Sequence, residues 1–95
     1  MPSFTTLPND ETTVLLGKSV MLSCVASGKP APKIVTWLLD GVKINFQSGR
    51  HSLKATGELV IFRAEKVDDG FYQCVAKNTV GGVASPKKKL NVACK

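Results

Sequence analysis

The sequence predicts an all-β fold in which two antiparallel sheets pack face to face. Turn-forming residues recur roughly every 8–12 positions, and none of the segments between them shows helical periodicity. Cys24 and Cys74 lie on either side of Trp37 in the sequence. A disulfide packed on a buried indole is one way for a sandwich to close two sheets over a thin core. These observations together favour a β-sandwich.

Length and composition favour one small domain with a hydrophobic core. Hydrophobic residues make up 43% of the 95 positions, too many for a disordered segment, and no apolar run approaches the roughly 18 residues of a membrane span. The chain opens on Met1-Pro2-Ser3 without an apolar signal region, so for a secreted parent we expect an excised piece. We expect a single domain over residues 1–95, with its core over about 3–93.

The first third of the chain contains short apolar segments separated by turns. We expect an edge strand over Phe4–Leu7, an interruption at Pro8, and a continuation over Thr12–Leu16. Val20–Ala26 has apolar side chains at every second position, which is typical of a half-buried strand. Ser27–Pro32 contains two prolines, which fix φ and lack an amide donor, so this segment is predicted to be a loop.

The middle of the chain predicts three more strands. Ile34–Leu39 and Val42–Phe46 are separated by Asp40-Gly41, a strong signal for a tight turn. Arg50–Leu53 is predicted to be a weak edge strand, and the apolar segment Leu59–Phe62 a buried one.

The last third completes the predicted sandwich. Ala64–Gly70 is expected to cross between the sheets and to lead into a strand over Phe71–Lys77. A turn over Asn78–Gly82 then precedes one long final strand over Val83–Val92. The prediction is therefore eight or nine short strands and no helix.

Two runs of residues resemble a known family. The first is Gly17-x-x-Val20-x-Leu22-x-Cys24-x-Ala26-x-Gly28-x-Pro30-x-Pro32. The second is spread over Trp37-x-x-Asp40-Gly41, Leu59-x-Ile61, Asp68-x-Gly70-x-Tyr72-x-Cys74-x-Ala76-x-Asn78-x-x-Gly81 and Leu90-x-Val92. In this order the runs resemble an intermediate-set (I-set) immunoglobulin domain of neural cell-adhesion and axon-guidance receptors. The resemblance covers nearly the whole chain.

The resemblance implies an immunoglobulin-like, antiparallel two-sheet sandwich with one inter-sheet disulfide, Cys24 to Cys74. Tyr72 stands two residues before Cys74, where a tyrosine corner bonds its hydroxyl to upstream backbone. The resemblance also implies an ion pair between Arg50 and Asp68. We expect the following residues to be structural: Trp37, Tyr72, Leu22, Leu59, Ile61, Asp68 and Gly70.

Two departures from the family spacing predict local irregularities. One extra residue lies between Pro32 and Trp37, and strand alternation then directs Val35 inward and Ile34 outward, so we expect a bulge or a loop residue near Lys33-Ile34.

The final strand is also one residue too long. Alternation from inward-facing Leu90 and Val92 turns Lys88 toward the core. A buried lysine is unfavourable, so we expect a bulge near Pro86 that releases it.

Nothing in the chain predicts catalysis, a metal site or a cofactor. His51 is the only histidine and is expected to lie on the surface, and neither a zinc-ligand spacing nor a nucleophile motif such as Gly-x-Ser-x-Gly is present. Asp68-Asp69 falls in a family turn and is interpreted as structural. Cys94 is the odd cysteine. It is an exposed thiol, a partner for another domain or chain, or a replacement for one of the sandwich cysteines.

The net charge of +6 suggests anionic partners. The aromatic residues do not alternate with the cations, which argues against nucleic acid. Lys87-Lys88-Lys89 is the only basic run, and alternation sends Lys87 and Lys89 to one side. These two lysines form either a solvated edge or a contact for a sulfated glycan.

A protein-binding face is predicted on the sheet that carries Trp37 and Cys74. Alternation directs four side chains away from the core: Leu38, Phe71, Gln73 and Val75. A contiguous exposed apolar area commonly marks a contact surface. The alternative is that these are scattered single residues, or that residues around Ile44 and Phe46 cover them.

The resemblance implies a non-catalytic recognition module in the extracellular part of a cell-surface or secreted protein. Its partners would be other immunoglobulin-like or fibronectin-like domains or a secreted ligand, with no membrane insertion of this domain. The first alternative is an intracellular mechanical or scaffolding domain of the titin and myosin-binding type, since similar domains occur there. The second is a basic domain that binds heparan sulfate.

Overall fold

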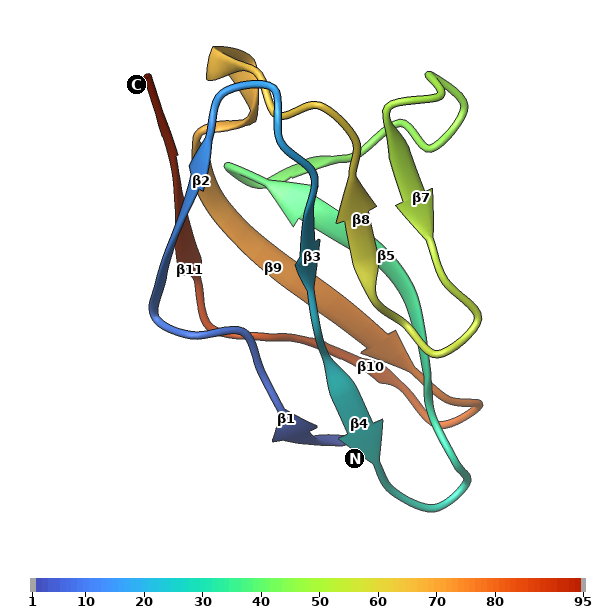
Figure 1. Ribbon diagram of the computed structural model, residues 1–95. Helices are drawn as coiled ribbons and strands as arrows, with labels where there is room; N and C mark the ends of the chain where they lie inside the picture. The colour runs from blue at the N-terminus through green and yellow to red at the C-terminus, as the bar shows by residue number, and fades with distance from the viewer. Residues whose placement is uncertain (1, 95) are drawn as a thin grey trace.

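The computed structural model describes residues 2–94 and shows two packed sheets (Figure 1). The larger sheet has the strand order β2-β11-β9-β5-β6, with β10 also pairing with β9; the smaller sheet has the order β3-β8-β7, and β1 pairs with β4. The strands are β1 (Ser3–Thr6), β2 (Glu11–Leu15), β3 (Val20–Leu22), β4 (Val25–Ser27), β5 (Lys33–Leu39), β6 (Val42–Lys43), β7 (His51–Leu53), β8 (Leu59–Ile61), β9 (Gly70–Lys77), β10 (Gly82–Ala84) and β11 (Lys88–Ala93). The all-β, two-sheet prediction is confirmed.

The interruption around Pro8 divides the N-terminal segment between two sheets. β1 pairs with β4 in an antiparallel ladder, whereas β2 pairs with β11 in a parallel one, with Thr12 opposite Leu90. Proline cannot donate a ladder hydrogen bond, so the chain changes partners where Pro8 stands.

The core lies between the two sheets and surrounds one indole. Trp37 of β5 and Tyr72 and Cys74 of β9 are fully buried from the larger sheet, and Leu59 and Ile61 of β8 meet them from the smaller sheet. The remaining buried members of the cluster are Val14, Leu22, Cys24, Ala64, Leu90 and Val92.

The bulge in β5 lies one residue later than the sequence suggested, and it reverses the predicted orientation. Ile34 pairs with Ala76 and Thr36 pairs with Val75, so Val35 is the extra residue. Ile34 packs against the core, whereas Val35 is 42% exposed. The prediction of an inward Val35 is therefore wrong, because the bulge itself absorbs the shift in alternation.

The predicted long final strand is two strands. β10 ends at Ala84 and β11 begins at Lys88, with Pro86 in the irregular segment between them. The break fits the expected irregularity near Pro86. The Lys88 side chain remains only 14% exposed, and its ammonium bonds to Asp10 Oδ1 at 2.7 Å. The long stem covers apolar surface while the charge reaches a carboxylate at the edge.

The connection between the sheets contains a short helix that the sequence analysis did not predict. A 3₁₀ turn, η1 (Lys66–Asp68), precedes β9. The backbone N–H of Glu65 donates to Asp68 Oδ2 at 2.7 Å, so a local side-chain contact stabilises this turn. None of the helices within residues 2–94 is long and apolar enough to cross a membrane.

Candidate protein-binding face

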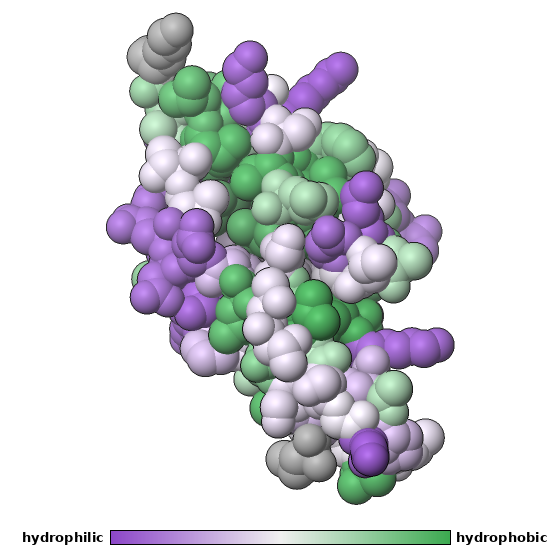
Figure 2. Space-filling view, turned by 60° about the horizontal axis from the view of Figure 1, so that its bottom comes forward, coloured by the Kyte–Doolittle hydropathy of each residue, from purple (hydrophilic) through white to green (hydrophobic). Residues whose placement is uncertain are grey.

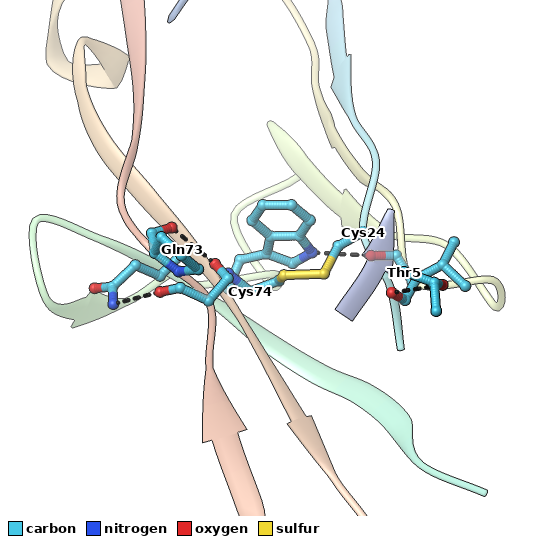
Figure 3. The surroundings of a disulfide bond; sticks show 9 residues. Thr5, Cys24, Gln73 and Cys74 are labelled. Carbon is cyan, nitrogen blue, oxygen red and sulfur yellow. Dashed lines mark hydrogen bonds between the residues drawn. A yellow bond between two sulfur atoms is a disulfide. The ribbon is translucent and has the colours of Figure 1, made fainter. Parts of the chain in front are cut away.

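A covalent link supports the inner side of the larger sheet. Cys24 and Cys74 form a disulfide that joins the two layers (Figure 3), and Trp37 of β5 lies opposite Cys74 in the ladder with β9. Trp37 Nε1 donates a hydrogen bond of 2.9 Å to the carbonyl oxygen of Gly57. Gly57 has φ +102°, and a Cβ there would lie 2.7 Å from Ile34 Cγ1. The indole is therefore held from the loop side as well as by the disulfide.

Asp68 is a buried polar residue at which several hydrogen bonds meet. Its side chain is buried, and it accepts a hydrogen bond from the Arg50 guanidinium. The Tyr72 hydroxyl donates to the carbonyl oxygen of Asp68 at 2.5 Å, the geometry of a tyrosine corner. Burial, followed by the nearby carboxylate of Asp68, raises the pKa of Tyr72, so the phenol remains protonated. Gly70 completes the turn, where a Cβ would lie 2.7 Å from Asp40 Oδ2.

His51 is not the surface residue that the sequence suggested. Its side chain is only 12% exposed, and Nε2 lies 3.4 Å from Asp68 Oδ1. Burial lowers the pKa of His51, although the Asp68 charge acts in the other direction. With Arg50 and Asp68 it lines a cavity of about 330 Å³ at the edge between the sheets, whose other walls are largely apolar.

The outer side of the larger sheet brings two of the predicted face residues together. Leu38 and Val75 line a groove of about 510 Å³ on β5, β6 and β9. Its other lining residues are Val35, Thr36, Lys43 and Lys77. Ile44 and Phe46 pack against the core instead of covering this face. We call the six lining residues the β5–β9 groove.

The other two predicted face residues, Phe71 and Gln73, lie on β9 but do not line the groove. Phe71 is 45% exposed, and the Lys89 ammonium lies 5.5 Å from its ring centroid. Gln73 pairs with Leu38 across the strands, and its amide nitrogen donates to the Ser85 carbonyl oxygen at 2.9 Å (Figure 3). The outward position of Val35 could not be predicted from the sequence, because only the position of the bulge decides which side Val35 faces.

The basic run does not form one free cationic patch. Lys88 pairs with Asp10, and Lys89 Nζ lies 2.5 Å from Asp69 Oδ1. Hydrogen bonds from these lysines lower the pKa of Asp10 and of Asp69. Lys87 is exposed. The two residues proposed for a glycan, Lys87 and Lys89, therefore differ: one is free of the ion pairs that the structure records among residues 2–94, and the other is neutralised.

The remaining reactive groups form no site of their own. Cys94 is an exposed free thiol. Residues 2–94 contain no cluster of three or more histidine, cysteine, aspartate or glutamate side chains arranged to hold a metal ion. In Figure 2 hydrophobic and hydrophilic residues are mixed over the visible side of the molecule, so this side shows no uniformly apolar face.

Comparison with known proteins places this geometry in a family. A family model described as the immunoglobulin domain matches residues 1–78. The "Probable oxidoreductase PXDNL" of Homo sapiens is 45% identical over 78 residues, which are 82% of this chain and 5% of that protein. The chain thus spans a small fraction of this relative and matches its immunoglobulin region, so the oxidoreductase activity in its name is not carried over.

Two solved structures show the same fold over nearly the whole chain. The N-terminal Ig1-2 module of the Drosophila receptor protein tyrosine phosphatase DLAR superimposes with a TM-score of 0.88 at 34% identity, covering 97% of this chain and 45% of that one. Titin domain M7 gives a TM-score of 0.82 at 32% identity, covering 97% of this chain and 93% of that one. The matched family model over residues 1–78 shows that this chain belongs to the immunoglobulin-domain family, and its structure resembles the domains of the receptor DLAR as well as a titin domain.

Proposed function

We propose that this domain is an extracellular recognition module that binds a protein partner through the outer side of its larger sheet. The observation that carries the proposal is the β5–β9 groove, which Leu38 and Val75 line and whose strand β9 also carries the exposed Phe71. Apolar surface of this kind is typical of contact sites. The inner side of the same strands holds Trp37 and the disulfide, so the face is presented on a rigid support.

The same disulfide supports the extracellular assignment. Disulfides persist in oxidising compartments and are rare in the cytosol. The chain also resembles titin domain M7, which favours a mechanical or scaffolding role as the second candidate. Intact-mass measurement of material from its native source, alkylated with and without reductant, distinguishes them. If Cys24 and Cys74 are alkylated only after reduction, they form a disulfide in the native source, which supports the extracellular recognition module. If both thiols are alkylated without reductant, the mechanical or scaffolding role is supported.

Binding is tested with the multimerised domain against a panel of recombinant ectodomains carrying immunoglobulin and fibronectin repeats. Leu38→Glu and Val75→Glu are expected to abolish binding to any partner found and to leave the melting temperature nearly unchanged, because these side chains face away from the core. Val67→Glu is the matched control, since Val67 is 72% exposed on η1 and lies outside the groove. Equal binding by Leu38→Glu and by the control contradicts the proposed face.

A further inference from the structure

The two ends of the outer face differ in charge. At the Phe71 end, Lys89 is paired with Asp69. At the other end, Lys33 of β5 lies directly opposite Lys77 of β9 in the ladder, and both are exposed. Like charges directly opposite one another destabilise a sheet. The ion pairs recorded within residues 2–94 include neither of these lysines, so their charges are available to an external anion.

The β5–β9 groove lies next to this lysine pair. Lys77 forms part of its wall, and Lys43, which pairs with Leu38 across β5 and β6, supplies a second cation on the same face. No aspartate or glutamate lines the groove. Its apolar part consists of Leu38, Val75 and the outward-turned Val35. The surface therefore combines an aliphatic floor with cations at two of its edges.

The neighbouring strand leaves room for the Lys77 stem. Gly82 of β10 lies opposite Lys77, and a Cβ on Gly82 would stand 2.7 Å from Lys77 Cγ. Any side chain at position 82 would displace the lysine stem. Lys77 thus has Gly82 as its partner on one side and Lys33 on the other, and it is itself one of the residues that line the groove.

We propose that the β5–β9 groove binds an acidic segment of a protein partner, with an apolar side chain in the groove and carboxylates paired with Lys33, Lys77 and Lys43. The proposal deepens the recognition function above and rests on it. Charge complementarity selects this occupant: a purely apolar partner would leave the Lys33–Lys77 repulsion in place. The aliphatic floor favours an acidic protein segment over a sulfated glycan, which offers no apolar side chain to fill it.

The test uses a phage-displayed library of random 12-residue peptides, selected on the wild-type domain. We expect the selected peptides to combine an apolar residue with aspartate or glutamate, and their chemical-shift perturbations to centre on Val35, Leu38 and Val75. The double variant Lys33→Glu/Lys77→Glu should weaken binding by about tenfold. The matched control Lys18→Glu/Lys54→Glu makes the same change in net charge at exposed lysines that neither line the groove nor pair with β5 or β9, and should bind as the wild type does.

Three results of the peptide and glycan experiments overturn the acidic occupant. The first is a selection that yields no binders. The second is a set of peptides without acidic residues, or with equal affinity for the Lys33→Glu/Lys77→Glu variant. The third is that a heparin-derived octasaccharide binds the wild-type domain, binds the Lys33→Glu/Lys77→Glu variant more weakly, and competes with the peptides. If an ectodomain partner is sensitive to Leu38→Glu but indifferent to Lys33→Glu/Lys77→Glu, the recognition function stands and this proposal falls.

Discussion

At the scale of single residues, one buried carboxylate, that of Asp68, organises the contacts around the start of β9. The Asp68 carboxylate accepts hydrogen bonds from the Arg50 guanidinium and from the Glu65 backbone amide. The Asp68 carbonyl oxygen accepts a further hydrogen bond from the Tyr72 hydroxyl. Buried charges are tolerated when they are paired and hydrogen-bonded in this way. The resemblance to immunoglobulin domains supplied the Arg50–Asp68 pair, but not His51, whose burial depends on how β7 packs over η1.

His51 makes the stability of the domain dependent on pH. Burial lowers its pKa in the folded state below the ordinary value near 6.5. The unfolded chain therefore takes up a proton more readily, and the free energy of unfolding falls as the pH drops from about 6.5 toward the folded-state pKa. We expect His51→Gln to remove this part of the acid dependence. Urea unfolding of the wild type and of the His51→Gln variant between about pH 7.5 and about pH 5 measures how the free energy of unfolding depends on pH.

Because the sequence contains one histidine, the difference between the two unfolding series reports on His51 alone. The imidazole proton resonances give an independent measure of the same titration. A folded-state pKa at or above that of an unstructured peptide would contradict the expected direction.

At the scale of elements, the extra residue in β5 determines the shape of the binding face. With Val35 bulged out, Ile34 remains inward and Thr36 outward, and the alternation into Trp37 is preserved. Parity counted along the sequence predicted the opposite for Val35, because alternation holds only within an unbroken ladder. The irregularity near Pro86 could be placed from the sequence, since proline marks the site of the break. Val35 carries no such mark.

Deleting Val35 should leave a folded domain with a flatter outer face. The remaining residues Ile34, Thr36 and Trp37 would alternate inward, outward and inward, so the ladder with β9 becomes regular. We expect a melting temperature close to that of the wild type and the loss of one apolar wall of the β5–β9 groove. Thermal unfolding measures the melting temperature. The amide resonances of the two proteins show whether the variant is folded and how the surroundings of the groove change.

Deletion of Leu38 is the matched control, because it brings Trp37 and Leu39 into adjacent positions and forces one of these two inward residues to face solvent. This variant should fail to fold. Comparable melting temperatures for the two deletions would show that β5 slides without cost and that the bulge does not fix its register.

At the scale of the whole molecule, the two layers are joined across the core by one covalent link. The two-sheet architecture follows from the alternation and turn residues of the sequence, and the family resemblance implies the Cys24–Cys74 bond and the structural role of Trp37. The ion pairs of the lysines in the basic run do not follow from the sequence. Lys88 with Asp10 and Lys89 with Asp69 join residues from distant segments, so the basic run resembles a free patch until the sheets are assembled.

The Cys24–Cys74 bond should contribute about 4 kcal/mol to the free energy of unfolding, since it closes a long loop in the unfolded chain. Cys24→Ala/Cys74→Ala is expected to lower the urea midpoint and to increase the slope of the transition per unit of denaturant, because the unfolded chain without the cross-link is less compact and exposes more surface. Cys94→Ser should leave both unchanged, because Cys94 is exposed and unpaired. An unchanged midpoint for the double variant would show that packing around Trp37 suffices alone.

The parallel pairing of β2 with β11 determines how the domain responds to tension. β1, near the start of the chain, and the end of β11 lie at opposite ends of the molecule (Figure 1), and the molecule measures 45 Å along its longest axis. A force that draws the two ends apart pulls β2 and β11 in opposite directions along their shared ladder, from Glu11 opposite Lys89 to Leu15 opposite Ala93. These hydrogen bonds are loaded in shear and must break together, so the domain would transmit a pull as a stiff segment until the whole ladder gives way.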